Sequence, residues 1–295
     1  MRARILVVLL ALAASALPAA AQQAAPPGAS GMPPGLAERY QVAAWPQPSA
    51  ARAGWDTGSL AVPGWERVSL RLDPRAVEAT LGLRPAAKQQ PQETHPGQQA
   101  KAPQPKDAQS KDAQSKEAQP TVLVRVRSCA SPAAARRWLL AHLGACQTTL
   151  RREPGLGDVA FGARGGERLL YVAAAQGNLA WTVRALRPDV DAGPVAAAVD
   201  AHTRRAPVGA AKAPRLEGAE PAPAAQPGQP LPFSLSFAGD APAALDFDAG
   251  PHASVVPAQG RYLLYADRAG EVEVKVTFMT ADLRAAKAVI VLHAR

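Results

Sequence analysis

The sequence predicts an α+β domain, with an antiparallel sheet and helices on one face of it, followed by a small all-β sandwich. Apolar and polar residues alternate in segments 67–73 and 122–127, as in strands that are buried on one face. Helix and strand signals are mixed up to residue 205, whereas only strand signals occur after residue 231. This change divides the chain into an α+β domain, residues 35–205, and a β-sandwich, residues 231–295.

Turn and cap residues separate the elements of the first domain. Ser131-Pro132 predicts a helix start, because a hydroxyl N-cap precedes a proline at the first helical position, and Gly144 predicts its end. A second helix is expected from Gly193 to Thr203, with Asp191 as its cap. Between the helices lie three strand-like segments, 158–163, 168–174 and 179–186.

The second domain contains strand signals at intervals of about ten residues, which is typical of a small sandwich. The predicted strands are 233–237, 244–247, 254–257, 261–266, 271–278 and 286–293.

Two segments resemble known kinds of domain. The turn Gly155-Leu-Gly-Asp-Val159, followed by strands joined at Gly177-Asn178, resembles α+β domains of exported bacterial proteins, a resemblance that implies no activity. Residues 262–278, in which Asp267-Arg-Ala-Gly270 turns into a strand, resemble the closing hairpin of bacterial Ig-like modules. This second resemblance implies an Ig-like sandwich with a spacer or adhesive role.

The first 21 residues predict export through a Sec-type signal peptide. Arg2 and Arg4 precede an apolar run from Ile5 to Leu17, and three alanines stand before Gln22, where cleavage is expected. The run is too short to span a bilayer, so the mature chain is expected to have no transmembrane segment and to be periplasmic or secreted.

Three further segments are expected to lack a packed core. Residues 22–34 and 206–230 are rich in Ala and Pro and predict a flexible lead and an extended linker. Residues 85–120 contain three near-copies of a Lys-Asp-Ala-Gln-Ser unit and no large apolar residue, which predicts a disordered insertion within the first domain.

Positive charge is concentrated in the first domain. The chain has a formal charge of +9, and residues 121–205 contain twelve Arg, no Lys and six acidic residues. Outside the cytoplasm such a surface favours an acidic polysaccharide or an envelope protein as partner over nucleic acid. Two arginine pairs are the candidate binding residues, namely Arg136, Arg137, Arg151 and Arg152. The alternative is that these arginines only solvate the surface.

Cys129 and Cys146 are the only cysteines. In an oxidising compartment they are expected to form a disulfide, provided that the helix between them is short enough for their Cα atoms to approach within about 7 Å.

No motif of a common enzyme class is present, so we expect a non-enzymatic protein without cofactor or metal. Asp246, Asp248 and His252 form the nearest approach to a metal-ligating group. Trp45, Trp55 and Trp65 are either a platform for sugar rings or part of a core. The leading hypothesis is an exported protein that binds an envelope protein or acidic glycan. The alternative is a periplasmic hydrolase or an accessory subunit of one, in which carboxylates would converge in a cleft.

Overall fold

The computed structural model describes residues 35–86, 119–209, 212–221 and 229–294. The predicted signal peptide, the predicted lead and nearly all of the predicted insertion lie outside these residues. None of the described helices has the length and apolar character needed to cross a bilayer.

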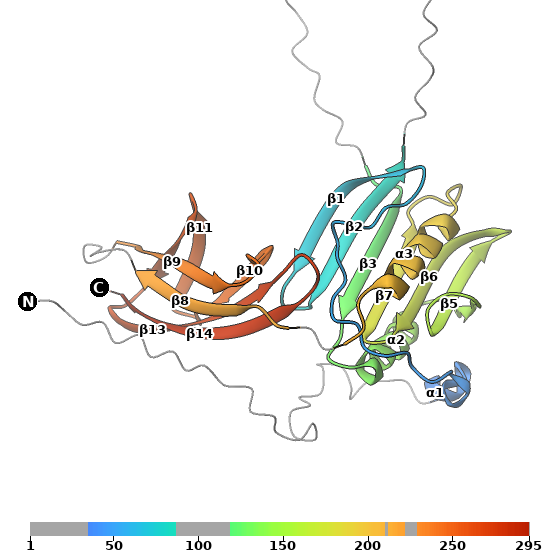
Figure 1. Ribbon diagram of the computed structural model, residues 1–295, viewed down its shortest axis with the longest axis horizontal. Coiled ribbons are helices and arrows are strands. Elements are labelled where there is room, and N and C mark those ends of the chain that lie inside the picture. The colour runs from blue at the N-terminus through green and yellow to red at the C-terminus, as the bar shows by residue number, and fades with distance from the viewer. Residues whose placement is uncertain (1–34, 87–118, 210–211, 222–228, 295) are drawn as a thin grey trace, which may run out of the picture.

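The described chain forms two side-by-side units built around three antiparallel sheets (Figure 1). The prediction of an α+β fold is wrong, because strands make up 47% of the structure and the three α-helices are short. The prediction identified both longer helices but missed strands that enlarge the sheets.

A seven-stranded sheet forms the first unit, in the order β1-β2-β3-β7-β6-β5-β4. Helix α1 and the 3₁₀ helix η2 precede this sheet, α2 lies between β3 and β4, and α3 follows β7. The bounds of these elements are α1 Leu36–Arg39, η2 Val42–Ala44, β1 Trp65–Asp73, β2 Glu78–Pro85, β3 Val122–Ser128, α2 Pro132–Ala145, β4 Arg151–Arg152, β5 Val159–Gly165, β6 Arg168–Gln176, β7 Leu179–Ala185 and α3 Gly193–Arg205.

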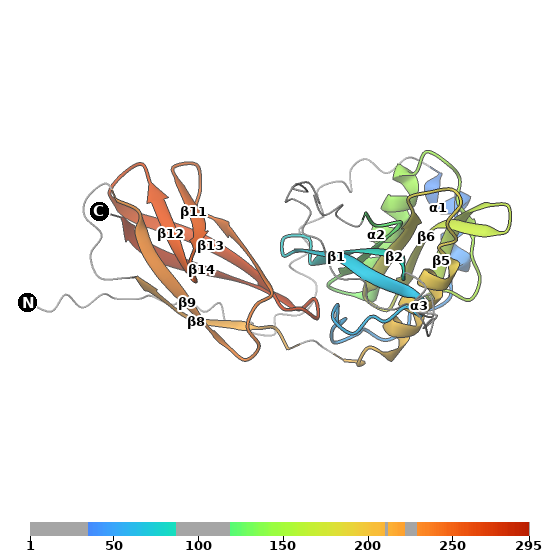
Figure 2. The same ribbon diagram turned by 90° about the horizontal axis from the view of Figure 1, so that it is seen from above.

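The two longer helices cover opposite faces of this sheet, as Figure 2 shows, so the prediction that the helices share one face is wrong. On β6 and β7, Val172 and Trp181 contact the α3 side, whereas Ala173 and Ala180 contact the α2 side, and all four are fully buried. Strands buried on both faces do not show the simple alternation of a one-sided sheet. Alanine on the α2 side also provides the space for that helix to approach the sheet closely.

Two sheets pack face to face to form the second unit. One sheet has the order β10-β13-β14 and the other β11-β12-β9-β8. Phe233 and Leu264 from one sheet share a buried cluster with Val276 and Ile290 from the other. The bounds are β8 Arg215–Pro221, β9 Leu231–Ala238, β10 Ala244–Asp248, β11 Ala253–Ala258, β12 Arg261–Ala266, β13 Gly270–Met279 and β14 Ala285–Ala294.

Strand β8 lies within the segment 206–230 that was predicted to be a linker. It pairs antiparallel with β9 and forms one edge of the four-stranded sheet, so part of that segment belongs to the sandwich. Its sequence, RLEGAEP, contains only one large apolar residue, Leu216, and is surrounded by Ala- and Pro-rich sequence. A single apolar residue produces no alternating pattern, so the strand was not predicted.

The β13–β14 hairpin connects the two units. Its tip places Met279 and Leu283 in the core of the first unit, where both are almost fully buried. The Trp55 N–H donates to the carbonyl oxygen of Asp282 at 2.7 Å, and the Thr57 N–H donates to that of Ala281 at 3.2 Å. The first unit therefore completes its core with residues of the second.

We expect Leu283→Ala to lower the free energy of unfolding by about 2–5 kcal/mol, because it leaves a cavity in a shared core. Leu283 has a left-handed backbone conformation (φ 60°), which is similarly unfavourable for leucine and for alanine. The substitution therefore measures the loss of side-chain packing and not a change in backbone strain. Urea denaturation measures the effect. Val291→Ala, at a side chain that is 45% exposed, is the matched control and should change stability by about 0.5 kcal/mol at most. Equal stability of the two variants would contradict the shared core.

Candidate functional site

The structure gathers two of the four predicted binding arginines at one edge of the seven-stranded sheet. Arg151 and Arg152 form the edge strand β4, and with Arg39 of α1 they line an open groove of about 430 Å³. We call this surface the arginine groove. Its other lining residues are Tyr40, Gln41, Ala44, Trp45, Pro46, Leu150 and Phe161.

Buried aromatic rings form the floor of the arginine groove. Phe161 of β5 meets Tyr40 edge-on at a centroid distance of 5.1 Å and lies 5.8 Å from Trp45. The Trp45 indole N–H donates to the Tyr40 carbonyl oxygen at 2.9 Å, which fixes the ring. Trp45 is thus a core residue that underlies the groove, and Trp55 is fully buried, so these two tryptophans do not form an exposed platform.

Two arginine guanidinium groups lie over these aromatic rings. The guanidinium of Arg152 lies 5.5 Å from the centre of the Phe161 ring, and that of Arg39 lies 5.8 Å from the centre of the Tyr40 ring. No carboxylate lines the groove, and within the described residues Arg39, Arg151 and Arg152 form no ion pair. Arg39 donates from Nη2 to the hydroxyl oxygen of Thr149. The arrangement leaves the guanidinium groups of Arg151 and Arg152, and the remaining N–H groups of Arg39, available to an anion.

Arg136 approaches the same groove from α2. It donates a hydrogen bond to the carbonyl oxygen of Pro46, and its buried Nε has no hydrogen-bond partner in the described structure. Burial lowers the pKa of Arg152, and the positive charge of Arg136 lowers it further. Because these two cations repel each other, a bound anion would relieve their repulsion.

Arg137 lies apart from the groove, exposed on the outer side of α2. Sequence reasoning missed Arg39 and Tyr40, because their segment precedes the first predicted strand and meets β5 only in the folded chain. Neither residue carries a local signal of its position.

A second polar cluster lies on the other flank of α2. The Trp138 and His142 rings stack with a centroid distance of 5.0 Å and an angle of 7°, and His142 Nε2 shares a hydrogen bond with the Tyr171 hydroxyl group. We call these three residues the ring array. Burial lowers the pKa of His142, and the charge of Arg125 lowers it further. Burial also raises the pKa of Tyr171. Both groups are therefore neutral at neutral pH.

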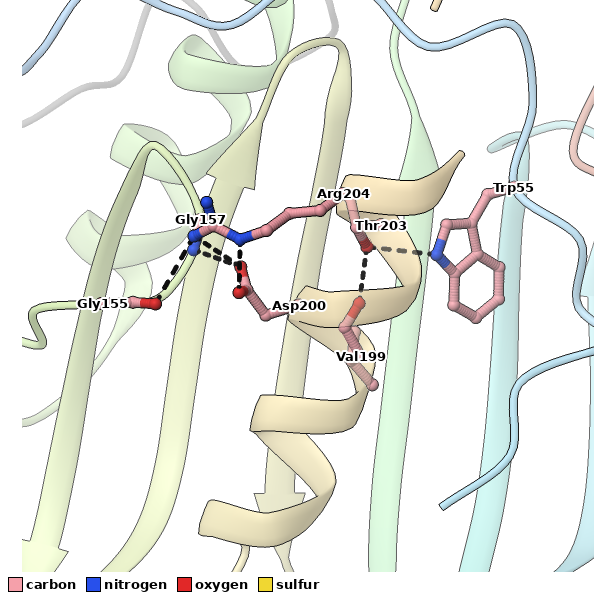
Figure 3. Close-up of polar contacts among 7 residues, drawn as sticks. All are labelled: Trp55, Gly155, Gly157, Val199, Asp200, Thr203 and Arg204. Carbon is pink, nitrogen blue, oxygen red and sulfur yellow. Dashed lines mark hydrogen bonds and ion pairs between the residues drawn. The ribbon is translucent and has the colours of Figure 1, made fainter. Parts of the chain in front are cut away.

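Most carboxylates of the first unit have structural partners. Figure 3 shows buried Asp200 of α3, which accepts hydrogen bonds from the Gly157 N–H at 2.6 Å and from Arg204 Nε at 2.7 Å. Nearby, the Trp55 indole donates to the Thr203 hydroxyl at 3.2 Å. Asp158 accepts from the N–H groups of Ser49 and Gly177. The Gly-Leu-Gly-Asp segment identified in the sequence thus serves to anchor loops.

The glycine at position 157 is required by this anchoring. Its backbone has φ +58°, and a Cβ atom there would lie 2.8 Å from the Ala175 carbonyl oxygen. A side chain would displace the N–H that Asp200 accepts.

A larger hollow of about 640 Å³ lies between the two units, lined by residues that include His202, Arg205 and Arg284. Arg284 is paired with Asp240 and Asp282, and His202 Nε2 lies 3.0 Å from the Asp56 carbonyl oxygen. These polar groups of the hollow thus bond within their own units, Arg284 to two aspartates of the second unit and His202 to a carbonyl oxygen of the first.

The sequence-based metal candidates have other partners. Asp246 pairs with Arg75 at 2.6 Å, and Asp248 accepts from the Gly250 N–H. His252 faces Asp267 at 3.9 Å. The described residues contain no group of three or more potential metal ligands.

The predicted disulfide is absent, since Cys129 and Cys146 are free thiols in the structure. Helix α2 lies between the two cysteines. Its 14 residues make it about 21 Å long, which is three times the Cα separation that a disulfide tolerates. Burial raises the pKa of Cys129 to about 11 and also raises that of Cys146, so both are protonated at neutral pH.

No family model, curated protein or solved structure matches this chain.

We expect thiol titration of the unfolded protein, without reductant, to yield two thiols, because α2 holds the cysteines apart. The Cys129→Ala variant should yield one thiol under the same conditions. No thiol in the parent protein would indicate a disulfide and would contradict the helix length.

We expect the His142 ring to make stability depend on pH. Its folded-state pKa lies below the ordinary value of 6.5, so the unfolded chain binds more protons than the folded one as the pH falls below about 6.5. The contribution of this group is thus complete above that pH and is lost progressively on acidification. His142→Phe should reduce the fall in the free energy of unfolding between about pH 7 and about pH 5.

Chemical denaturation at several pH values measures this dependence. His252→Phe, at an exposed ring, is the matched control and should retain the dependence of the parent. If His142→Phe retained it too, the assignment to His142 would be incorrect.

Proposed function

We propose that this protein is an exported, non-enzymatic protein that binds an acidic polysaccharide of the cell envelope through the arginine groove. The observation that supports the proposal is a groove lined by Arg39, Arg151 and Arg152, which form no ion pair within the described chain, and by no carboxylate. Arg39 and Arg152 lie over the aromatic rings of its floor. The signal-like N-terminal segment supports a location where such polymers occur.

The chemistry of the groove suits a carboxylated or sulfated sugar chain. Guanidinium groups donate paired hydrogen bonds to planar carboxylates and to sulfates, and their charge raises the rate of encounter with an anionic polymer. Tyr40 and Phe161 line the groove beneath the arginines, but each is only 4% exposed, so the guanidinium groups supply most of the surface that a ligand would contact.

The size of the groove favours a glycan over an envelope protein. A stable protein interface buries about 800 Å² on each partner and is commonly flat, whereas a hollow of about 430 Å³ fits a few units of a chain. The hydrolase alternative receives less support, since Glu153 is paired with Arg164 and the carboxylates of Asp158 and Asp200 accept backbone N–H groups.

We expect the Arg151→Ala/Arg152→Ala variant to bind polygalacturonate about tenfold more weakly, because two exposed charge contacts are each worth about 0.5–1 kcal/mol. Elution of the full chain from a polygalacturonate matrix by a salt gradient measures the effect, and binding should weaken steeply with salt. A heparin matrix distinguishes sulfated from carboxylated chains.

The matched control is Arg168→Ala/Arg205→Ala, which removes the same charge from exposed positions outside the groove. Equal elution of the two double variants would show that only net charge matters and would overturn the proposal. Failure of the parent protein to bind either matrix would overturn it as well.

A further inference from the structure

Helix α2 covers only part of its face of the seven-stranded sheet. Its buried residues contact β5, β6 and β7. Arg125, in the middle of β3, and Arg184, near the end of β7, lie on the same face of the sheet. Arg184 lies opposite Leu123 of β3 on one side and Tyr171 of β6 on the other. Arg125 lies opposite Thr182, one step along the same face. Both arginines are exposed.

The ring array stands beside these two arginines. Trp138 stacks on His142, which in turn lies against Tyr171 on the sheet. All three side chains are half-buried, so part of each ring remains accessible. Arg125 and Arg184 are close enough for their charges to favour ionisation of the Tyr171 hydroxyl. Aromatic rings bordered by guanidinium groups also characterise the arginine groove, on the opposite flank of α2.

The two arginines differ in their partners. Arg125 donates from Nε and Nη2 to one oxygen of buried Glu78, at 2.9 and 2.7 Å. Arg184 forms no ion pair within the described residues. Because His142 and Tyr171 are neutral, Arg184 supplies most of the uncompensated charge of this cluster.

Arg137 connects the two flanks. Ala135, Leu139 and Leu143 face the sheet, so Arg137 projects from the outer side of α2, between the arginine groove and the ring array. A basic route thus runs from the edge strand, over the helix and down to β7.

We propose that Arg184 and Arg125, together with the ring array, form a second subsite for the same acidic polysaccharide, which crosses α2 over Arg137. This inference rests on the proposed function. An α-helix is about 10–12 Å across with its side chains, so only a polymer longer than this engages both flanks. Joining two weak contacts in one ligand strengthens binding, because the second contact forms within an already bound complex.

The experiment follows the Trp45 indole N–H by ¹⁵N NMR in the full chain, since this group lies under the arginine groove. Digalacturonate is too short to engage both flanks, whereas polygalacturonate spans them. Arg184→Ala should weaken polygalacturonate binding, read at Trp45, by about fivefold and leave digalacturonate binding unchanged. Arg184→Lys should restore part of the affinity, and Arg168→Ala is the matched control and should behave as the parent.

Several results separate this inference from the proposed function. If Arg184→Ala leaves polygalacturonate binding unchanged while Arg151→Ala/Arg152→Ala weakens it, the second subsite is refuted and the groove stands. Equal weakening of dimer and polymer by Arg184→Ala also refutes the subsite, because Arg184 would then act on the groove itself. If neither ligand moves the Trp45 resonance, the proposed function fails and the inference fails with it.

Discussion

The burial of strands β6 and β7 on both faces is the constraint on which the rest of this structure depends. Val172 and Trp181 pack under α3, while Ala173 and Ala180 lie under α2. The small side chains on one face let α2 sit close to the middle of the sheet, where it divides that face into two flanks. The arginine groove lies on one flank and the ring array on the other. Both candidate sites therefore result from the packing of α2 against the middle of the sheet.

Burial of the opposite face requires residues from the second unit. Trp55 lies between α3, where its indole bonds to Thr203, and the β13–β14 hairpin, where its backbone bonds to Asp282. Met279 and Leu283 fill the remaining core. The sandwich therefore helps to stabilise the sheet that carries the arginines, although it contributes no residue to the arginine groove.

Charge is distributed in accordance with this architecture. On the α3 side, Asp200 holds the turn at Gly157 and pairs with Arg204, and Asp158 holds two further backbone segments. These carboxylates are used within the fold. On the α2 side, Arg125 is paired with Glu78, whereas Arg152 of β4 has no acidic partner among the described residues. This uncompensated charge at the sheet edge is the physical basis of the proposed anion binding.

The sequence by itself determined the local elements. The Ser131-Pro132 start of α2 is confirmed, since Ser131 accepts the Ala134 N–H at 3.1 Å. The strand signals of residues 67–73 and 122–127 lie within β1 and β3, because period-two alternation depends only on neighbouring residues. Strand β2 was missed although Ala79, Leu81 and Leu83 alternate with polar or small residues, since alanine and glycine weaken that signal.

Only the tertiary structure decided which surfaces meet. Periodicity shows which residues share a face but not what covers it, so the placement of helices on opposite faces and the insertion of Leu283 into the first unit could not be predicted. The separation of Cys129 from Cys146 depended on where α2 ends, and the arginine groove required Arg39 to meet a strand more than a hundred residues later. These outcomes depend on packing between distant segments, which a local pattern of residues does not encode.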